Sequence, residues 1–238
     1  MNFRTMKQII LLPLLFFCVT FGYSQSVLLE ENVDYYEDTP EYGPNRKHYV
    51  HFYGSYGHLL GSSKEGKSEI DPLLSSYFDL GSRYKRRFSQ LFSIGYDLSL
   101  SNRNFRLAES DARNLPNNNL LDKEKINVFS LGAVIYSRFN VGRRGNYIGN
   151  FLDIGVFGGW NFSSRYYYKN EYKEGQYRKY SEYNPDYVKA LNYGVLARIG
   201  YNRYVLFARY RFSDMIDTQG NYEDLPPFNI GVQIGFHK

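Results

Sequence analysis

The sequence predicts an all-β fold, an eight-stranded antiparallel transmembrane up-and-down β-barrel with short periplasmic turns and long extracellular loops. Three observations predict it. Hydrophobic and polar residues alternate with a period of two along most of the chain, and 25 Tyr and 18 Phe accompany 1 Trp. The connections between the alternating segments are short and long in turn. Tyr and Phe favour strands, and an even strand count with short turns at one end is typical of outer-membrane barrels.

Composition argues against two other classes of protein. Of the 238 residues, 43% are hydrophobic, 18% are aromatic and 22% are charged. Each helical membrane span needs about 20 consecutive apolar residues, and no such run follows residue 21. Disordered chains are poor in aromatic residues. A helical membrane bundle is therefore excluded and disorder is disfavoured, while the length suits one ordinary domain or two small ones.

Residues 1–24 have the pattern of a secretory signal peptide. Arg4 and Lys7 form a basic head, residues 9–21 are almost entirely apolar, and small residues occupy the −3 and −1 positions of a cleavage after Ser24. The alternative is a membrane anchor. The apolar stretch is too short for that, because a helix must cross a hydrocarbon core of about 30 Å.

The mature chain is predicted to lack cysteine. Cys18 lies inside the signal peptide and follows two phenylalanines, where a lipoprotein would have small residues. A chain without cysteine has no disulfide framework and no cysteine metal site. Residues 25–46 are predicted to be a periplasmic leader rich in acidic residues and Tyr, either a solvated tail or a short peptide that docks on a neighbour. The barrel is expected over 47–238.

Eight segments alternate with a period of two. They cover about 47–57, 74–84, 90–102, 125–140, 147–166, 187–200, 203–213 and 227–237. In the last of them Phe228, Ile230 and Val232 alternate with Asn229 and Gly231. This period gives each strand one apolar and one polar face.

The connections differ by parity. The second, fourth and sixth are short and centre on Arg86–Arg87, Gly142–Gly145 and Asn202–Arg203. The first, third, fifth and seventh are long and polar. Short turns at one end and long loops at the other place both chain ends on the periplasmic side of a barrel.

The polar face of the strands carries many charges. Its candidate lumen network is Asp79, Arg83, Asp97, Arg138, Asp153, Asn192, Arg198, Arg209, Arg211 and Gln233. In a membrane barrel the polar face lines the lumen and the apolar face meets lipid, and the aromatic ends of the strands suit the two interfaces. Eight strands leave just enough room for side chains to fill the interior. We expect the charges to pair there; the alternative is that some arginines lie on the surface of a soluble β domain.

The last strand carries the spacing of Asn229, Gly231, Ile234 and Phe236, with two residues after it. This spacing resembles the C-terminal signal by which the outer-membrane assembly machinery recognises its barrels.

With Ser24 followed by Gln25, eight strands and Tyr-rich loops, the chain resembles the small outer-membrane barrels of Bacteroidota, the PorT-like group. The resemblance covers the architecture of most of the mature chain, with few identity-level motifs. It implies an outer-membrane location. Some members of the group are accessory parts of the type IX secretion apparatus, and other small barrels serve assembly and transport machines.

Motifs for chemistry are scarce. His58 with Ser62 and Ser63 is a weak hint of a lipid-modifying enzyme, and His48 and His51 suit a polar rim at the periplasmic end. No spacing suggests a metal site, and no Gly-rich phosphate loop precedes a helix. We therefore predict no catalytic residues, no cofactor, no metal and no nucleic-acid partner.

The fifth connection, residues 165–187, interleaves tyrosines with Lys and Glu. Its candidate partner residues are Tyr166, Tyr167, Tyr168, Tyr172, Tyr177, Tyr180, Tyr183 and Tyr187. Tyr is favoured at interfaces because it buries a large area at low entropic cost. The alternative, weighed equally, is a hairpin that extends beyond the membrane and is shielded by these tyrosines.

These observations lead to a functional expectation. The protein should be a non-enzymatic barrel that serves as an accessory or structural subunit of an envelope machine, for protein secretion or outer-membrane protein assembly. Its partners would be outer-membrane lipid and other outer-membrane or periplasmic proteins of a larger complex. The alternatives are an outer-membrane lipid-modifying enzyme and a free-standing structural or adhesive barrel.

Overall fold

The computed structural model describes most of the chain after the leader. The described residues are 41–61, 70–108, 121, 123–142, 145–173, 176–217 and 224–237. The predicted signal peptide, residues 25–40 of the predicted leader, Ser62 and Ser63 lie outside them, and so does the side chain of Tyr172.

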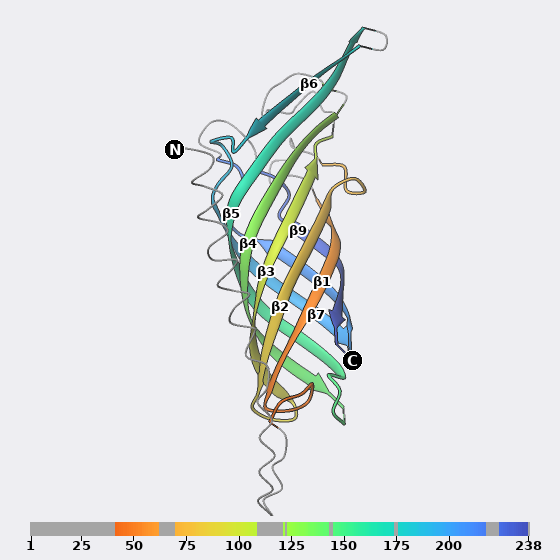
Figure 1. The fold of residues 1–238 in the computed structure, drawn as a ribbon, viewed down its shortest axis with the longest axis vertical. Helices are drawn as coiled ribbons and strands as arrows, with labels where there is room; N and C mark the ends of the chain where they lie inside the picture. Colours follow the sequence, from red (N-terminus) through yellow and green to blue (C-terminus); the bar gives the residue numbers. More distant parts are fainter. Residues whose placement is uncertain are drawn as a thin grey trace, which may run out of the picture. The chain divides into compact units, whose positions relative to one another are not determined.

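Nine antiparallel strands build the described chain (Figure 1). They are β1 His48–Leu60, β2 Ser76–Arg87, β3 Phe92–Arg106, β4 Lys123–Val141, β5 Asn150–Lys173, β6 Gln176–Tyr183, β7 Leu191–Tyr201, β8 Tyr204–Arg211 and β9 Phe228–Phe236. No helix long and apolar enough to cross a bilayer occurs among the residues that the structure describes.

Eight of these strands form a closed ring. Hydrogen bonding runs in the order β4-β3-β2-β1-β9-β8-β7-β5, and β5 pairs back with β4. The first and last strands meet between Phe52↔Phe236 and Leu60↔Phe228. Closure pairs the backbone groups that an open sheet would leave at its edges. The predicted eight-stranded antiparallel barrel is therefore confirmed.

The ninth strand, β6, departs from the prediction. The fifth segment was expected to end near residue 166, yet β5 continues to Lys173 because β6 pairs with it from Arg165↔Tyr183 onward. One edge of β5 pairs with β4. The other edge pairs with β7 along Asn150–Trp160 and with β6 from Arg165 onward. The fifth connection therefore contains the hairpin that was one of the two expectations, and a partner site on it stays a prediction.

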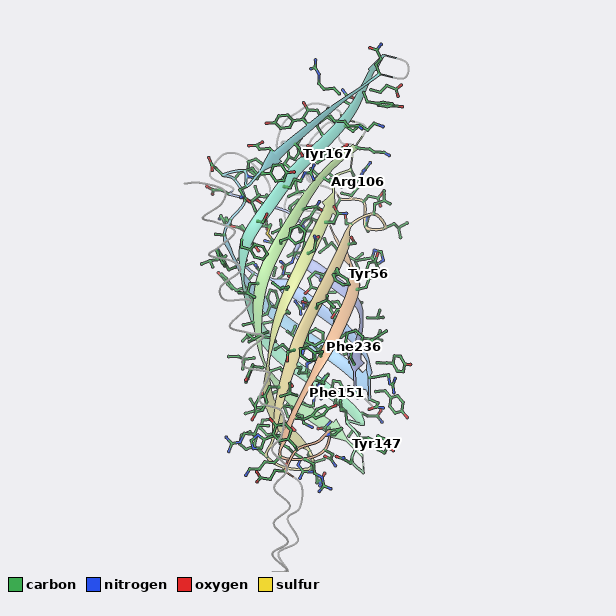
Figure 2. The ribbon with its side chains drawn as sticks, viewed as in Figure 1. Tyr56, Arg106, Tyr147, Phe151, Tyr167 and Phe236 are labelled. Carbon is green, nitrogen blue, oxygen red and sulfur yellow. The ribbon has the colours of Figure 1, made fainter. Side chains whose placement is uncertain are left out.

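The polarity of the wall is the inverse of a soluble domain. Along β7 every second residue is buried, and the buried parity carries Arg198, 1% exposed, while Ile199 is 67% exposed. The same rule holds at Leu206, 62% exposed on β8. In water the apolar side chains would be the buried ones. Side chains project from the barrel near Tyr147 at one end and near Tyr167 at the other (Figure 2).

The lumen is layered along its length. A large apolar cluster fills the end nearest the long loops: Leu59, Ile70, Tyr77, Phe105, Leu107, Ile126, Val128, Tyr166, Phe207, Met215, Ile216 and Leu225. A smaller cluster of Tyr49, Ile148, Phe151 and Val205 lies at the short-turn end. Charged side chains occupy the space between these clusters, together with a third apolar cluster of Val134, Tyr136, Phe157 and Leu196, in which the Tyr136 ring lies against Arg83 and Arg138. Only the charged layer was expected from the sequence.

Candidate functional site

Asp97 on β3 is a shared acceptor in the middle of the lumen. Its carboxylate receives two hydrogen bonds from Arg83, Nε to Oδ1 at 2.9 Å and Nη2 to Oδ2 at 3.0 Å. Arg198 Nη2 donates to Oδ2 at 2.6 Å. Asp97 is 0% exposed and both arginines are 1% exposed. Fork-shaped contacts of this kind fix geometry as well as supplying attraction.

Asp153 on β5 repeats the arrangement one step away. Arg138 donates to it through Nε at 2.7 Å and Nη2 at 2.9 Å. Arg198 Nη1 lies 3.8 Å from its Oδ2, so Arg198 links the two aspartates. Arg83 also donates to Gln233 Oε1 at 3.1 Å. The pairs form one continuous network rather than separate bridges.

Two more arginines of the predicted set lie toward the loop end. Arg209 donates to Tyr77 Oη at 2.5 Å and to Asp79 Oδ2 at 3.3 Å. Arg211 pairs with Asp224 at 3.0 Å and donates to the carbonyl of Leu225 at 2.6 Å. Asn192 is the remaining member and donates to Asn161 Oδ1 at 2.7 Å. All ten predicted lumen residues thus lie inside the ring.

The structure adds lumen residues that the sequence reasoning missed. Arg103, 8% exposed, donates to Ser130 Oγ at 2.9 Å and to Asn192 Oδ1 at 3.4 Å. The sequence did contain the pattern that identifies Arg103. Arg103 continues the polar parity of β3, but it lies one residue past the expected end of that strand at 102. Asp224 was missed because it precedes β9 and lies in a connection, where no alternation of polar and apolar residues predicts the direction of a side chain.

Tyrosine rings cover the arginines, and glycines make room for the rings. The Arg83 guanidinium lies 4.8 Å from the Tyr53 ring centroid and 5.6 Å from that of Tyr136, within the range of cation–π attraction. A Cβ at Gly95 would lie 2.2 Å from the Tyr84 carbonyl and 2.4 Å from the Tyr136 hydroxyl. Gly95 is therefore a packing position.

The histidines do not assemble a catalytic group among the described residues. His58 Nδ1 lies 3.2 Å from the Pro72 carbonyl in an exposed position. Its predicted neighbours Ser62 and Ser63 lie outside the described residues. His48 Nδ1 lies 2.7 Å from Tyr84 Oη. His51 is buried and packs edge-on to His237, with ring centroids 5.1 Å apart. No group of three metal-ligating side chains occurs in the described part of the chain.

The last residues of the predicted leader are fastened to the short-turn end of the barrel. The Lys85 ammonium donates to the Pro44 carbonyl, and Asn45 Nδ2 donates to the Gly145 carbonyl at 2.8 Å. Lys47 donates to Glu41 at 2.9 Å and thereby lowers the pKa of that carboxyl. Residues 41–46 are therefore held against the barrel itself, and docking of the leader on a neighbouring protein stays a prediction.

The predicted partner tyrosines separate onto two faces of the extension formed by β4, β5 and β6. On the inner face, Tyr166 donates to Glu124 Oε1 at 2.6 Å, and the rings of Tyr168 and Tyr180 stack at 5.3 Å. Tyr187 packs against the apolar cluster at the loop end. The outer face carries Tyr167, Tyr177 and Tyr183, which follow the opposite parity. Strand alternation causes the division.

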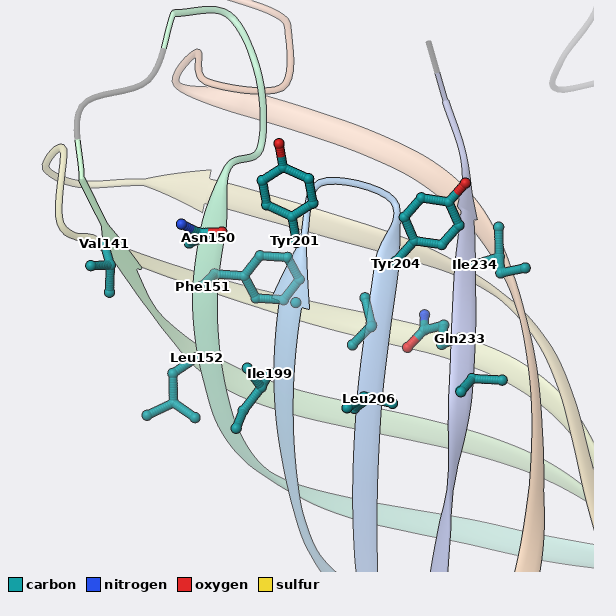
Figure 3. Close-up of a pocket in the computed structure, with 13 residues that line it drawn as sticks. Val141, Asn150, Phe151, Leu152, Ile199, Tyr201, Tyr204, Leu206, Gln233 and Ile234 are labelled. Atoms are coloured by element: carbon teal, nitrogen blue, oxygen red, sulfur yellow. The ribbon is translucent and has the colours of Figure 1, made fainter.

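An apolar groove of about 800 Å³ opens in the wall near the short-turn end, across β5, β7, β8 and β9. Tyr201 and Tyr204 stand on adjacent strands at its rim, with Ile199 and Leu206 beyond them (Figure 3). These side chains belong to the outward apolar parity. The groove is thus part of the apolar wall, without polar groups arranged for chemistry.

The residues of the resembled assembly signal occupy the closing strand. Asn229 points inward and is 4% exposed, while Ile234 and Phe236 point outward and are 45% and 61% exposed. A Cβ at Gly231 would lie 2.3 Å from the Tyr56 carbonyl of β1. Recognition by an assembly machinery stays a prediction.

Comparisons with known proteins give little beyond this geometry. No protein-family model matches the sequence, and no curated protein matches it. Ail, the attachment invasion locus protein of Yersinia pestis, is similar with a TM-score of 0.38 and 16% identity over 79% of this chain and 97% of that one. A second structure of Ail, in complex with the heparin analogue sucrose octasulfate, gives a TM-score of 0.29 and 14% identity over 78% and 94%. The fold assignment rests on the strand pairing of the described chain.

Proposed function

We propose that the protein is a closed, non-enzymatic barrel of the bacterial outer membrane that acts through its outer surface, as a free-standing structural or adhesive barrel. One observation carries the proposal. The lumen is filled by apolar clusters and buried ion pairs, while a three-stranded extension stands beyond the ring, and most side chains of its strand β6 are exposed. A lumen packed in this way among the described residues leaves the exterior as the acting surface.

The exposed wall supports placement in a membrane. Its outward side chains include Leu98 at 55%, Ile135 at 63% and Leu206 at 62% exposed. Soluble monomers rarely expose contiguous apolar patches larger than a few hundred Å². Aromatic residues such as Trp160 and Tyr201 occur at opposite ends of this wall, as the girdles of an outer-membrane barrel do. An outer membrane is the bacterial membrane in which such closed barrels occur.

Trimming the extension tests whether the outer surface carries the function. Replacing residues 169–179 by Asn-Gly joins Tyr168 to Tyr180, whose rings already stack, through a turn suited to a two-residue hairpin. The trimmed chain should still show a heat-dependent shift on a detergent gel. Cells that produce it should lose adhesion or envelope integrity to the level of cells without the gene. Full function in the trimmed strain would contradict the proposal.

A subunit of an envelope machine is the second candidate, and β6 is the feature that favours it. In the described chain β6 pairs with β5 alone, and free strand edges are used to bind partners by strand addition. Purification in mild detergent separates the two candidates. A stoichiometric envelope protein that the trimmed variant loses would support a machine for secretion or assembly. A barrel recovered alone supports the free-standing form.

The lipid-modifying enzyme is tested by one substitution. His58→Ala should leave lipid composition and the activity of the protein unchanged, because the described neighbourhood of His58 offers a backbone carbonyl rather than a nucleophile. Altered lipid acylation in wild-type cells that disappears in His58→Ala cells would support the lipid-modifying enzyme instead.

A further inference from the structure

We propose that the outward face of the β4–β5–β6 extension binds the anionic phosphate headgroups of the membrane leaflet from which it emerges. The proposal rests on the membrane placement above and adds a ligand that this placement does not require. The face, called here the basic face, carries Lys123, Lys125, Arg165, Lys169 and Lys179.

The strand register brings like charges together. Lys169 of β5 stands directly opposite Lys123 of β4 on one side and Lys179 of β6 on the other. Like charges in directly opposite positions destabilise a sheet. A row of three lysines across three adjacent strands is therefore unfavourable in the isolated protein, and an anion on this row would remove the repulsion.

The balance of charge on the basic face is one-sided. Glu171 is the single carboxylate among the described residues of this face, against five cations. Counter-charge for most of the face must come from outside the sheet. The ligand is expected to be anionic and to present several negative groups at strand spacing, about 5 Å apart.

Tyrosines hold the cations in place. The Lys169 ammonium lies 3.4 Å from the Tyr177 ring centroid, and the Lys125 ammonium lies 5.3 Å from that of Tyr167. Arg165 lies 5.0 Å from the Tyr183 ring centroid. Cation–π contacts orient the charge without neutralising it. Three of the five cations of the basic face are thus held against rings, and the cations outnumber the one described carboxylate.

The position of the basic face identifies lipid as the source of the anion. It continues the outward parity of the apolar wall, where Phe129, Trp160 and Phe162 are 44%, 54% and 45% exposed. At about 3.3 Å per residue and a tilt near 45°, each residue rises about 2.3 Å along the membrane normal. Arg165 then stands about 7 Å above Phe162 and Lys169 about 16 Å above it.

These heights fit a headgroup layer. The polar region on each side of a bilayer is about 5–8 Å thick, so the Arg165 guanidinium lies at headgroup level. The long stems of Lys123, Lys169 and Lys179 can bend back toward the surface, as snorkelling lysines do. A partner in free solution would not require the cations to share a face with the lipid-contacting wall.

Hydrogen exchange in nanodiscs provides the test. The full mature chain is placed in phosphatidylcholine discs and in discs that also contain phosphatidylglycerol, and exchange is followed in the peptide 165–183. Each Lys or Arg near an anionic membrane surface strengthens binding of the protein segment to that surface about fivefold. We expect exchange in this peptide to be at least about fivefold slower in the anionic discs, with β1 and β2 exchanging equally in both. Equal exchange of peptide 165–183 in both discs overturns the proposal.

Matched variants localise the effect. Lys169→Gln with Lys179→Gln should abolish the lipid difference, and Lys169→Arg with Lys179→Arg should retain it. Arg86→Gln with Arg203→Gln, which removes the same charge at the short-turn end, should leave peptide 165–183 unchanged. A soluble acidic peptide that protects the segment in phosphatidylcholine discs as strongly as anionic lipid would overturn the lipid assignment in favour of a protein ligand.

The outcomes separate this proposal from the one on which it rests. Protection of the β1 and β2 amides in discs and a heat-dependent shift on gels report the membrane barrel, whatever the headgroup. Their loss would refute the membrane placement. Their persistence with equal exchange in both discs would refute only the phosphate site.

Discussion

Strand β5 passes through two regions that use the same side chains in opposite ways. In the lumen its Asp153 holds Arg138 at 2.7 Å, and both are at most 1% exposed. Beyond the ring its Lys169 stands opposite two lysines and against the Tyr177 ring. A buried cation needs a carboxylate, whereas an exposed one loses little without it. The charges inside therefore serve closure and stability, and those outside are the ones free to meet a ligand.

Thiol accessibility should distinguish the two regions most clearly, because the expected difference is all-or-none. A cysteine at Arg178 of β6 should react with an impermeant maleimide in intact cells. A cysteine at Arg203, in a short turn, should react only after lysis, and one at buried Ser99 only after unfolding. Cys18 lies in the predicted signal peptide and does not compete. Labelling at Arg203 but not Arg178 in intact cells would reverse the orientation.

Removing lumen carboxylates should give the largest change in stability. Asp97→Ala with Asp153→Ala leaves three buried arginines without acidic partners. Each broken pair should cost about 3–5 kcal/mol, so the unfolding midpoint in urea should fall steeply. Asp186→Ala, at an exposed position, is the control and should change the free energy of unfolding by less than about 0.5 kcal/mol. A stable double variant would mean that the lumen pairs do not hold the barrel together.

A methyl group placed in the lumen should have an intermediate effect. Gly95→Ala puts a Cβ against the Tyr84 carbonyl and the Tyr136 hydroxyl, and such overpacking costs about 1–3 kcal/mol. Gly158→Ala is the matched control, because a Cβ there meets nothing within 4 Å. Urea unfolding of the two variants compares them directly. Similar midpoints would show that Tyr136 moves aside without cost.

Removing a cation from the extension should have the smallest effect on stability, with the opposite sign. Lys169→Gln relieves the repulsion from Lys123 and Lys179 across the sheet, a gain of about 0.2–1 kcal/mol in lipid without net charge. The measurement is the unfolding midpoint in zwitterionic vesicles, with Lys47→Gln, which breaks an exposed pair, as the comparison. A marked loss of stability in Lys169→Gln would show that the extension depends on this charge.

Much of the lumen could be predicted from single strands, and much of the extension could not. Arg83, Asp97 and Arg198 were identified because each falls on the polar parity of an alternating segment. The end of β5 was left open between a hairpin and a partner loop, because Tyr, Lys and Glu alternate there without an apolar parity. Its strand character depends on β6 returning beside it, which is a long-range condition. The docking of Asn45 on Gly145 was missed for the same reason.

The sequence by itself determines the strands, their number in the ring and which parity is apolar, because a period of two is a property of the local backbone. Which charges meet is decided by the tertiary structure. Asp97 on β3 and Arg198 on β7 lie across the lumen, 101 residues apart in the chain, and only ring closure brings them within 2.6 Å. The apolar cluster at the loop end likewise gathers Leu59 of β1, Phe105 of β3 and Met215 of the connection after β8. Alternation sets the direction of a side chain, and closure of the barrel sets its partner.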